Sequence, residues 1–146
     1  MSDAGDRAKS YFSSGFNCAQ SVLRSVLEEK NMYFDEAPFL TAGFGGGIGL
    51  EGNTCGAVTG AVMALGMLLA ENQKDPIEVK NKAYALTPKL LEQFRDKYGT
   101  TMCSQLVGFD MKDARARQKA SEEKLFQNIC PKFVSSAVEI VLALEL

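Results

Sequence analysis

The stretch from Cys55 to Ala70 constrains the fold more than any other part of this chain, because its sixteen consecutive residues carry no charge. Apolar side chains occupy every side of a helix here, a pattern typical of a helix buried at the centre of a domain. The stretch is shorter than the roughly 20 apolar residues that a membrane-spanning helix needs. We therefore expect a central buried helix over residues 54–71 and no membrane span.

Small residues recur at every fourth position of this stretch, namely Gly56, Gly60 and Ala64. Such a row lies on one face of a helix and lets a neighbouring backbone approach closely. The row therefore predicts a helix packed tightly against the central one.

The rest of the chain is dominated by helical periodicity, and no convincing alternating strand interrupts it. We expect helices over 3–13 and 17–29, a short one opened by Asp35, one from Asp75 to Gly99 that kinks or splits at Pro88, a short one ending near Gly108, and a last one beginning at Pro131. The charge-rich segment 113–127 is interpreted as a solvated face. The expected fold is all-α, a single domain over residues 1–146 with about six or seven helices around the central one.

Charge and composition exclude several classes of function. The net charge is −2, so no excess of positive charge is present to neutralise a nucleic-acid backbone. Histidine is absent, which removes the usual general base and the commonest metal ligand. The first ten residues have no apolar core and no cleavage site of a signal peptide, so a cytoplasmic location is expected, where thiols stay reduced.

A G-x-G-x-x-G motif runs from Gly47 to Gly52. A dinucleotide-binding turn needs a strand before these glycines and a helix after them, whereas helix and loop patterns precede them here. No NAD site is therefore expected. The glycine-rich loop leads to Cys55, and its backbone N–H groups suit a thiolate or a cluster sulfur. Gly52, Gly56 and Gly60 are the candidate contacts of such a bound group.

Four cysteines, Cys18, Cys55, Cys103 and Cys130, each lie in or just before the expected first turn of a helix. The positive end of a helix dipole lowers the pKa of a thiol, and the thiolate is both a nucleophile and a soft metal ligand. No C-x-x-C or C-x-x-C-H motif is present, so covalent haem is not expected. If the four converge, they form dithiol–disulfide couples or a four-cysteine site for zinc or an iron–sulfur cluster.

The order of the motifs resembles a known family. G-x-N-C-A-Q (Gly15 to Gln20) comes first, C-G-A-x-x-G (Cys55 to Gly60) second, and C-x-x-L-x-G-x-D (Cys103 to Asp110) third, before the lone Cys130. This order is similar to that of the redox-active proteins named for the pattern C_GCAxxG_C_C. The resemblance implies that the four cysteines are the signature thiols and that Gly56, Ala57 and Gly60 are the small residues of the central motif. It implies a redox role and defines no substrate.

Our leading hypothesis is a redox protein with an unidentified partner, which uses the four cysteines for thiol–disulfide exchange or electron transfer. Cys55 is the expected reactive thiolate and Cys18 its resolving partner. One alternative is a metal-binding module that holds zinc or an iron–sulfur cluster on Cys18, Cys55, Cys103 and Cys130 without catalysis. A second is a helical oligomerisation domain with inert buried cysteines. Ile140 and Leu142 make the last helix apolar on a second side, which predicts a homodimer through it.

Overall fold

The computed structural model describes residues 3–146, and this part of the chain contains eight α-helices, one 3₁₀ helix and no strand. The all-α expectation is thus confirmed. The elements are α1 (Asp3–Ser13), α2 (Cys18–Glu29), α3 (Ala37–Leu40), η1 (Ala42–Phe44), α4 (Gly56–Ala70), α5 (Pro76–Tyr98), α6 (Cys103–Val107), α7 (Ala114–Glu122) and α8 (Leu125–Ala143).

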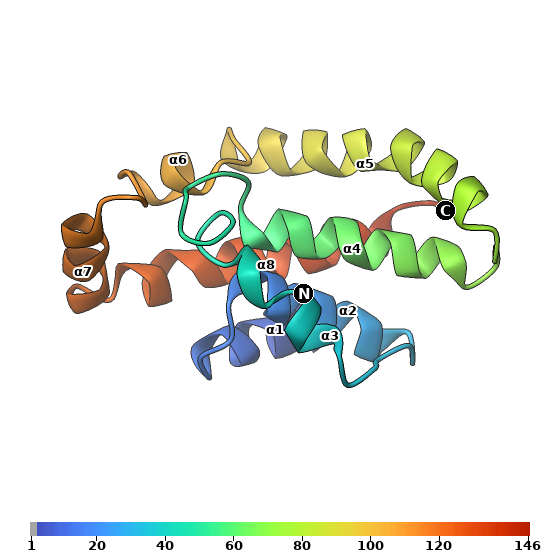
Figure 1. Cartoon of the computed structure of the whole chain (residues 1–146), viewed down its shortest axis with the longest axis horizontal. Helices are drawn as coiled ribbons and strands as arrows, with labels where there is room; N and C mark the ends of the chain where they lie inside the picture. The colour runs from blue at the N-terminus through green and yellow to red at the C-terminus, as the bar shows by residue number, and fades with distance from the viewer. Residues whose placement is uncertain (1–2) are drawn as a thin grey trace.

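The uncharged helix α4 lies in the middle of the molecule, as the sequence predicts. Figure 1 shows α4 and α8 side by side, with α5 on one side of them and α1 and α2 on the other. Val58, Ala61, Ala64 and Leu65 of α4 are completely buried. They belong to one continuous hydrophobic core to which α1, α2, α5 and α8 also contribute. Burial of these side chains stabilises the fold by roughly 25 cal/mol for each Å² of apolar surface removed from water.

Several helix ends follow the local chemistry of the sequence. Asn17 caps α2, with its side chain accepting a hydrogen bond from the backbone N–H of Gln20 at 2.8 Å. Asp75 caps α5 in the same manner through the N–H of Ile77. Gly99 ends α5 with a left-handed backbone (φ +84°), a conformation that glycine adopts without a steric penalty.

Pro88 does not split the helix that contains it. Helix α5 runs unbroken from Pro76 to Tyr98, although the proline removes one backbone donor from its interior. Leu86 packs against the core before the proline, and Leu90 and Phe94 pack after it. Tertiary packing on both sides of Pro88 outweighs its local preference to break a helix.

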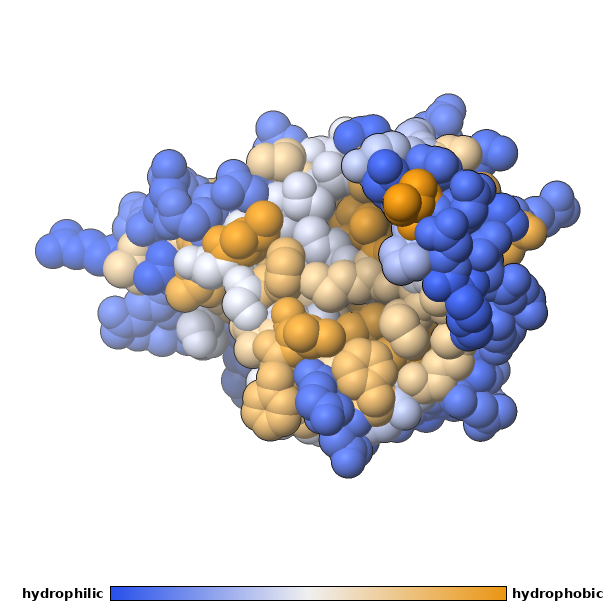
Figure 2. Space-filling model, turned by 45° about the vertical axis from the view of Figure 1, so that its right-hand side comes forward, coloured by the Kyte–Doolittle hydropathy of each residue, from blue (hydrophilic) through white to orange (hydrophobic). Residues whose placement is uncertain are grey.

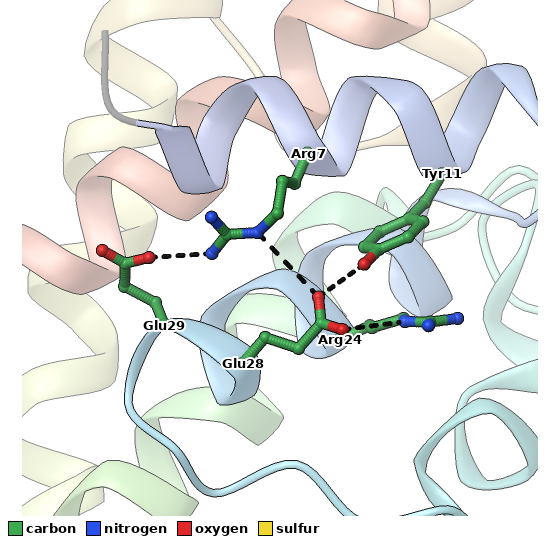
Figure 3. A network of polar contacts seen from close by, with 5 residues as sticks. All are labelled: Arg7, Tyr11, Arg24, Glu28 and Glu29. Atoms are coloured by element: carbon green, nitrogen blue, oxygen red, sulfur yellow. Dashed lines mark hydrogen bonds and ion pairs between the residues drawn. The ribbon is translucent and has the colours of Figure 1, made fainter.

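A polar network fastens α1 to α2, the helix that begins at Cys18 (Figure 3). Arg7 of α1 pairs with Glu29 at 2.8 Å, and the Tyr11 hydroxyl donates a hydrogen bond to Glu28 at 2.6 Å. Arg24 approaches the other oxygen of Glu28 at 3.3 Å. Burial and the hydrogen bond to Glu28 raise the pKa of Tyr11, which keeps the hydroxyl protonated as a donor. The network therefore links the two N-terminal helices at the end of α2 that lies away from Cys18.

The second apolar side of the C-terminal helix is used inside this chain. Helix α8 contacts α1, α2, α4 and α5, and Ile140 and Leu142 pack against the core as partly buried residues. The feature that motivated the homodimer is thus explained by packing within one molecule. A dimer through α8 stays a prediction.

Apolar side chains also gather on part of the surface, as Figure 2 shows for one face. The large hydrophobic residues that are exposed are Phe39, Leu40, Ile48, Leu50, Ile77, Tyr84 and Leu146. Exposed apolar patches are a common feature of interaction surfaces.

Within residues 3–146, no helix combines the length and the apolar character needed to cross a membrane.

Candidate functional site

Cys18 is the first residue of α2 and is held by the residues around it in the sequence. Asn17 and Gln20 form a capping box, in which the backbone N–H of Asn17 donates to the Gln20 side chain at 2.9 Å. The Asn17 amide also donates to the carbonyl of Ala42 at 3.1 Å, and the Gln20 amide donates to the carbonyl of Pro38 at 2.9 Å. These bonds fasten the start of α2 to α3 and η1. Gln20 was missed as a site residue, although the Asn-x-x-Gln spacing signals a capping box.

The two cysteine-containing motifs of α2 and α4 pack directly against each other. A Cβ atom at Gly60 would lie 2.8 Å from the Ala19 carbonyl oxygen, and one at Gly56 would lie 3.1 Å from the Cβ of Cys18. Only glycine permits this approach. The predicted close contact of a neighbouring helix with the small-residue row is confirmed at these two positions, and it brings the start of α2 beside the start of α4.

Cys55 and Cys103 are joined by a short backbone pairing that the sequence analysis did not foresee. Thr54 and Met102 form an isolated antiparallel bridge. The N–H of Cys55 donates to the Thr101 carbonyl at 2.8 Å, and the N–H of Cys103 donates to the Asn53 carbonyl at 2.7 Å. A bridge of one residue on each side has no periodicity to recognise, so no sequence signal identifies it.

Cys130 does not lie at the start of a helix, contrary to the sequence-based expectation. Helix α8 begins at Leu125, so Cys130 and Pro131 are both inside it. The apolar stripe continues upstream of the proline through Phe126, which packs against the core. Because the first four N–H groups of any helix lack partners within it, a proline this early removes only one further bond. The helix dipole therefore does not act on Cys130 as it acts on a first-turn residue.

Three of the four sulfurs come together around Cys18. The Cys18 thiol lies within hydrogen-bonding reach of the sulfurs of Cys130 and Cys55. Cys103 is farther off and interacts with Cys55 and Cys130 through charge alone. All four cysteines are free thiols, of which Cys18 is half-buried and the other three are buried. The structure thus groups residues that are distant in the sequence, with Cys18 between two others.

The thiols of Cys18, Cys55 and Cys103 differ in their acidity. Hydrogen bonding to Cys130 and to Cys55 raises the pKa of Cys18 well above its ordinary value. The pKa of Cys55 is lowered because its sulfur accepts the Cys18 hydrogen, while the backbone N–H groups of Ala57 and Val58 in the first turn of α4 also favour the thiolate. Burial raises the pKa of Cys103 to about 12. The group therefore favours a Cys55 thiolate beside a protonated Cys18.

The glycine-rich loop before Cys55 contains one turn of left-handed backbone. Gly46, Gly47, Ile48, Gly49 and Leu50 all have φ between +58° and +72°. Ile48 and Leu50 pay a steric cost of roughly 1–2 kcal/mol each in this conformation. Backbone hydrogen bonds within the loop hold it, among them one from Gly52 N–H to the Gly46 carbonyl at 3.0 Å. Strain that is held in place in this way is concentrated at functional sites in proteins.

A cavity of about 230 Å³ lies beside the cysteines. Its lining residues are Phe12, Asn17, Cys18, Gly46, Leu50, Cys103, Val107, Met111, Phe126 and Cys130. Three of the four cysteines line it, and Cys55 does not. A molecule in the cavity therefore lies against Cys18, Cys103 and Cys130, whereas Cys55 is outside the lining.

Comparison with known proteins agrees with this cysteine pattern. Residues 16–144 match the family model described as "Putative redox-active protein (C_GCAxxG_C_C)". The chain belongs to the C_GCAxxG_C_C family. A protein of Archaeoglobus fulgidus described as "Uncharacterized protein" is 28% identical over 135 residues, which cover 87% of this chain and 83% of that protein. No solved structure matches the chain.

The motifs of the C_GCAxxG_C_C family acquire a physical explanation from this geometry. The central C-G-A-x-x-G motif supplies the cap of α4 at Cys55 and the two glycines that admit α2. Gly52, the third predicted contact glycine, has φ +77° and lies against the side chain of Ser104. All three glycines thus have packing or turn roles, and their contact with a bound group stays a prediction.

The thiols of this family member offer no preformed metal site. Within residues 3–146, no three side chains of Cys, Asp or Glu are grouped so that they could hold a metal ion. A four-cysteine zinc or iron–sulfur site requires all its sulfurs around one centre, whereas Cys103 is not part of the hydrogen-bonded group that Cys18 forms with Cys55 and Cys130. The geometry therefore lends the metal hypothesis no support.

The raised pKa of Cys103 predicts a dependence of stability on pH. Its folded pKa of about 12 lies above the value of about 8.5 expected in the unfolded chain, so the unfolded state loses this proton first as the pH rises. The contribution of the Cys103 thiol to the free energy of unfolding is fully present below pH about 8.5. It should fall by about 3 kcal/mol by pH about 11. The free energy of unfolding in urea, measured for the wild type and Cys103→Ala with a phosphine reductant, checks this.

Between pH about 8 and pH about 11, we expect the free energy of unfolding of the wild type to fall by about 3 kcal/mol relative to that of Cys103→Ala. Titrating groups that do not interact with Cys103 act equally on both proteins and cancel in the difference. A difference that is constant over this range would contradict the assigned state of Cys103.

Proposed function

We propose that this protein carries out thiol–disulfide exchange, with Cys18 and Cys55 as its dithiol–disulfide couple. The observation that supports the couple is the hydrogen-bond contact between the Cys18 and Cys55 sulfurs, which raises the pKa of Cys18 and lowers that of Cys55. Cys18 lines the cavity and Cys55 does not, so Cys18 is the member of the couple that meets a substrate. This order reverses the sequence-based hypothesis, in which Cys55 attacks and Cys18 resolves.

The first step forms a mixed disulfide on Cys18. The Cys18 sulfur attacks one sulfur of a substrate disulfide, its proton moves to the Cys55 thiolate, and the second substrate sulfur leaves as a thiolate. The proton on Cys55 then passes to that leaving thiolate. Cys55 thereby supplies the basicity that a chain without histidine must obtain elsewhere.

The second step closes the couple. The Cys55 thiolate attacks the Cys18 sulfur, the Cys18–Cys55 disulfide forms, and the remaining substrate half leaves as a thiolate that takes a proton from water. The two cysteines lose two electrons and the substrate disulfide gains them. Because the N–H groups of α4 stabilise the Cys55 thiolate, they favour the reduced state, and the resulting disulfide is readily reduced again. Cys103 and Cys130 belong to the same proposed site as cavity-lining thiols.

Trapping the first disulfide tests the couple. The reduced protein is mixed with a small disulfide, quenched with acid at increasing times, and digested for peptide mapping by mass spectrometry. We expect the peptide pair Cys18–Cys55 to appear first, because Cys55 is the thiolate in contact with Cys18. The same reaction in urea serves as the control, where the four thiols should pair without preference. Early accumulation of a Cys18–Cys130 pair, or no native disulfide at all, would overturn the proposal.

A further inference from the structure

The cavity beside Cys18 carries information about the substrate. We infer that the site takes small apolar disulfides and excludes disulfides that carry charged groups, an inference that rests on the thiol–disulfide exchange proposed above. The cavity provides the site, and its wall chemistry defines the class of molecule that fits.

The walls are apolar apart from the thiols and one amide. Phe12 of α1, Val107 of α6 and Phe126 of α8 contribute to them, and no charged residue does. The single polar side chain, Asn17, is already engaged, since its oxygen accepts from Gln20 N–H and its amide donates to the carbonyls of Thr41 and Ala42. A carboxylate or an ammonium group that entered would lose water and find no partner.

The size of the cavity suits a small molecule. A 150 Å³ apolar cavity is enough to bind benzene, so a volume of about 230 Å³ admits a short-chain or monocyclic apolar disulfide. Cys18, Cys103 and Cys130 line the same space, so a bound disulfide lies against the half-buried Cys18.

The left-handed turn forms part of the wall. Gly46 and Leu50, which stand near the two ends of that turn, both line the cavity. A Cβ atom at Gly46 would clash with the Leu50 side chain, so the turn packs tightly against its own side chain there. The strained backbone thus presents an apolar side chain to the cavity, which is consistent with a wall shaped for an apolar ligand.

The exchange balances for such a substrate. An apolar disulfide R–S–S–R is reduced by two electrons to two R–SH, while Cys18 and Cys55 become the disulfide. Both protons that complete the two R–SH products come from the Cys18 thiol and from water, as in the steps above. No further oxidant or reductant is needed for one turnover.

Three probe disulfides of nearly equal length test the inference on the wild-type protein. Dipropyl disulfide ends in methyl groups, dithiodipropionate replaces them by carboxylates, and cystamine has ammonium groups. Rates of Cys18–Cys55 disulfide formation are divided by the rates of the same probes with a free small thiol, which removes differences in intrinsic reactivity. We expect dipropyl disulfide to react roughly 100-fold faster than both charged probes on this scale, because either charge enters an apolar cavity unpaired.

A cavity-filling variant provides an independent test. Val107→Phe should slow the reaction of the protein with dipropyl disulfide at least about tenfold, because the phenyl ring occupies the space that the probe needs. Val62→Phe is the matched control, since Val62 is a partly buried residue of α4 that does not line the cavity. Its rate should equal that of the wild type.

The outcomes separate this inference from the proposed function. Equal normalised rates for the three probes, or a fast reaction of cystamine alone, would overturn the apolar substrate class while the Cys18–Cys55 couple stands. Equal slowing by Val107→Phe and Val62→Phe would overturn the assignment of the cavity. If none of the probes produces the Cys18–Cys55 disulfide in the native protein, the proposed function itself fails.

Discussion

Cys18→Ser is expected to slow the reaction of the native protein with dipropyl disulfide by roughly 10³-fold or more, because it removes the one member of the Cys18–Cys55 couple that lines the cavity. Cys103 cannot replace it, because its sulfur makes no hydrogen bond to Cys55, whereas the Cys18 thiol donates its proton to the Cys55 sulfur. Serine preserves the shape of the side chain and the hydrogen bond to the Cys55 sulfur, so the fold should be retained.

Cys55→Ser is expected to stop the same reaction at the mixed disulfide between Cys18 and one half of the substrate. The mixed disulfide on Cys18 should accumulate, visible in the intact mass as one added substrate half, because the sulfur that resolves it is missing. This variant should also lose the thiolate absorbance that the wild type shows near 240 nm below the ordinary thiol pKa. Circular dichroism of both variants controls for folding. If Cys18→Ser reacts as fast as the wild type, or if Cys55→Ser still closes a disulfide, the assigned roles are wrong.

Gly60→Ala is expected to destabilise the protein by about 2 kcal/mol, although alanine is the better helix former. The added Cβ would lie 2.8 Å from the Ala19 carbonyl oxygen and 3.1 Å from the Ala19 Cα. Both are backbone atoms, so α2 and α4 must separate to relieve the clash. Urea unfolding of the reduced protein measures the change.

Gly66→Ala is the matched control on the same helix. Nothing lies within 4 Å of a Cβ added at Gly66, so this variant should gain up to about 1 kcal/mol from helix propensity alone. The same substitution six residues apart should therefore differ by about 3 kcal/mol in its effect. Similar effects at the two positions would show that the close approach of α2 to α4 has been misassigned. Separation of the helices in Gly60→Ala should also weaken the contact between Cys18 and Cys55.

Local sequence patterns predicted most of the helices because the relevant interactions lie within a few residues. Asn17, Asp75 and Gly99 mark helix ends by hydrogen bonds or backbone conformations that each residue satisfies locally. The same local logic failed at Pro131, where a typical first-turn residue lies inside α8. At Pro88 the sequence predicts a kink or a split, and the helix is not split, because packing on the core holds α5 together across that residue.

The candidate site was predicted less completely. The four cysteines and the acidifying effect of a helix start on Cys55 could be inferred from residue types and spacing. The neighbours of each sulfur could not, because they depend on contacts between residues tens of positions apart. Among these are the Cys18–Cys130 contact and the bridge between Thr54 and Met102. The cavity is likewise formed by side chains from α1, α2, α6 and α8 and the glycine loop.

The amino-acid sequence is sufficient to predict a buried uncharged helix, amphipathic helices around it, and thiols as the candidate nucleophiles of a chain without histidine. These properties follow from side-chain chemistry and helical period, which depend on residues close together in the sequence. Only the folded molecule shows that Cys18 lines the cavity and that Cys55 does not. That distinction depends on the close packing of α2 on α4 at Gly56 and Gly60, since desolvation and hydrogen bonding act through space and set the acidity of each thiol.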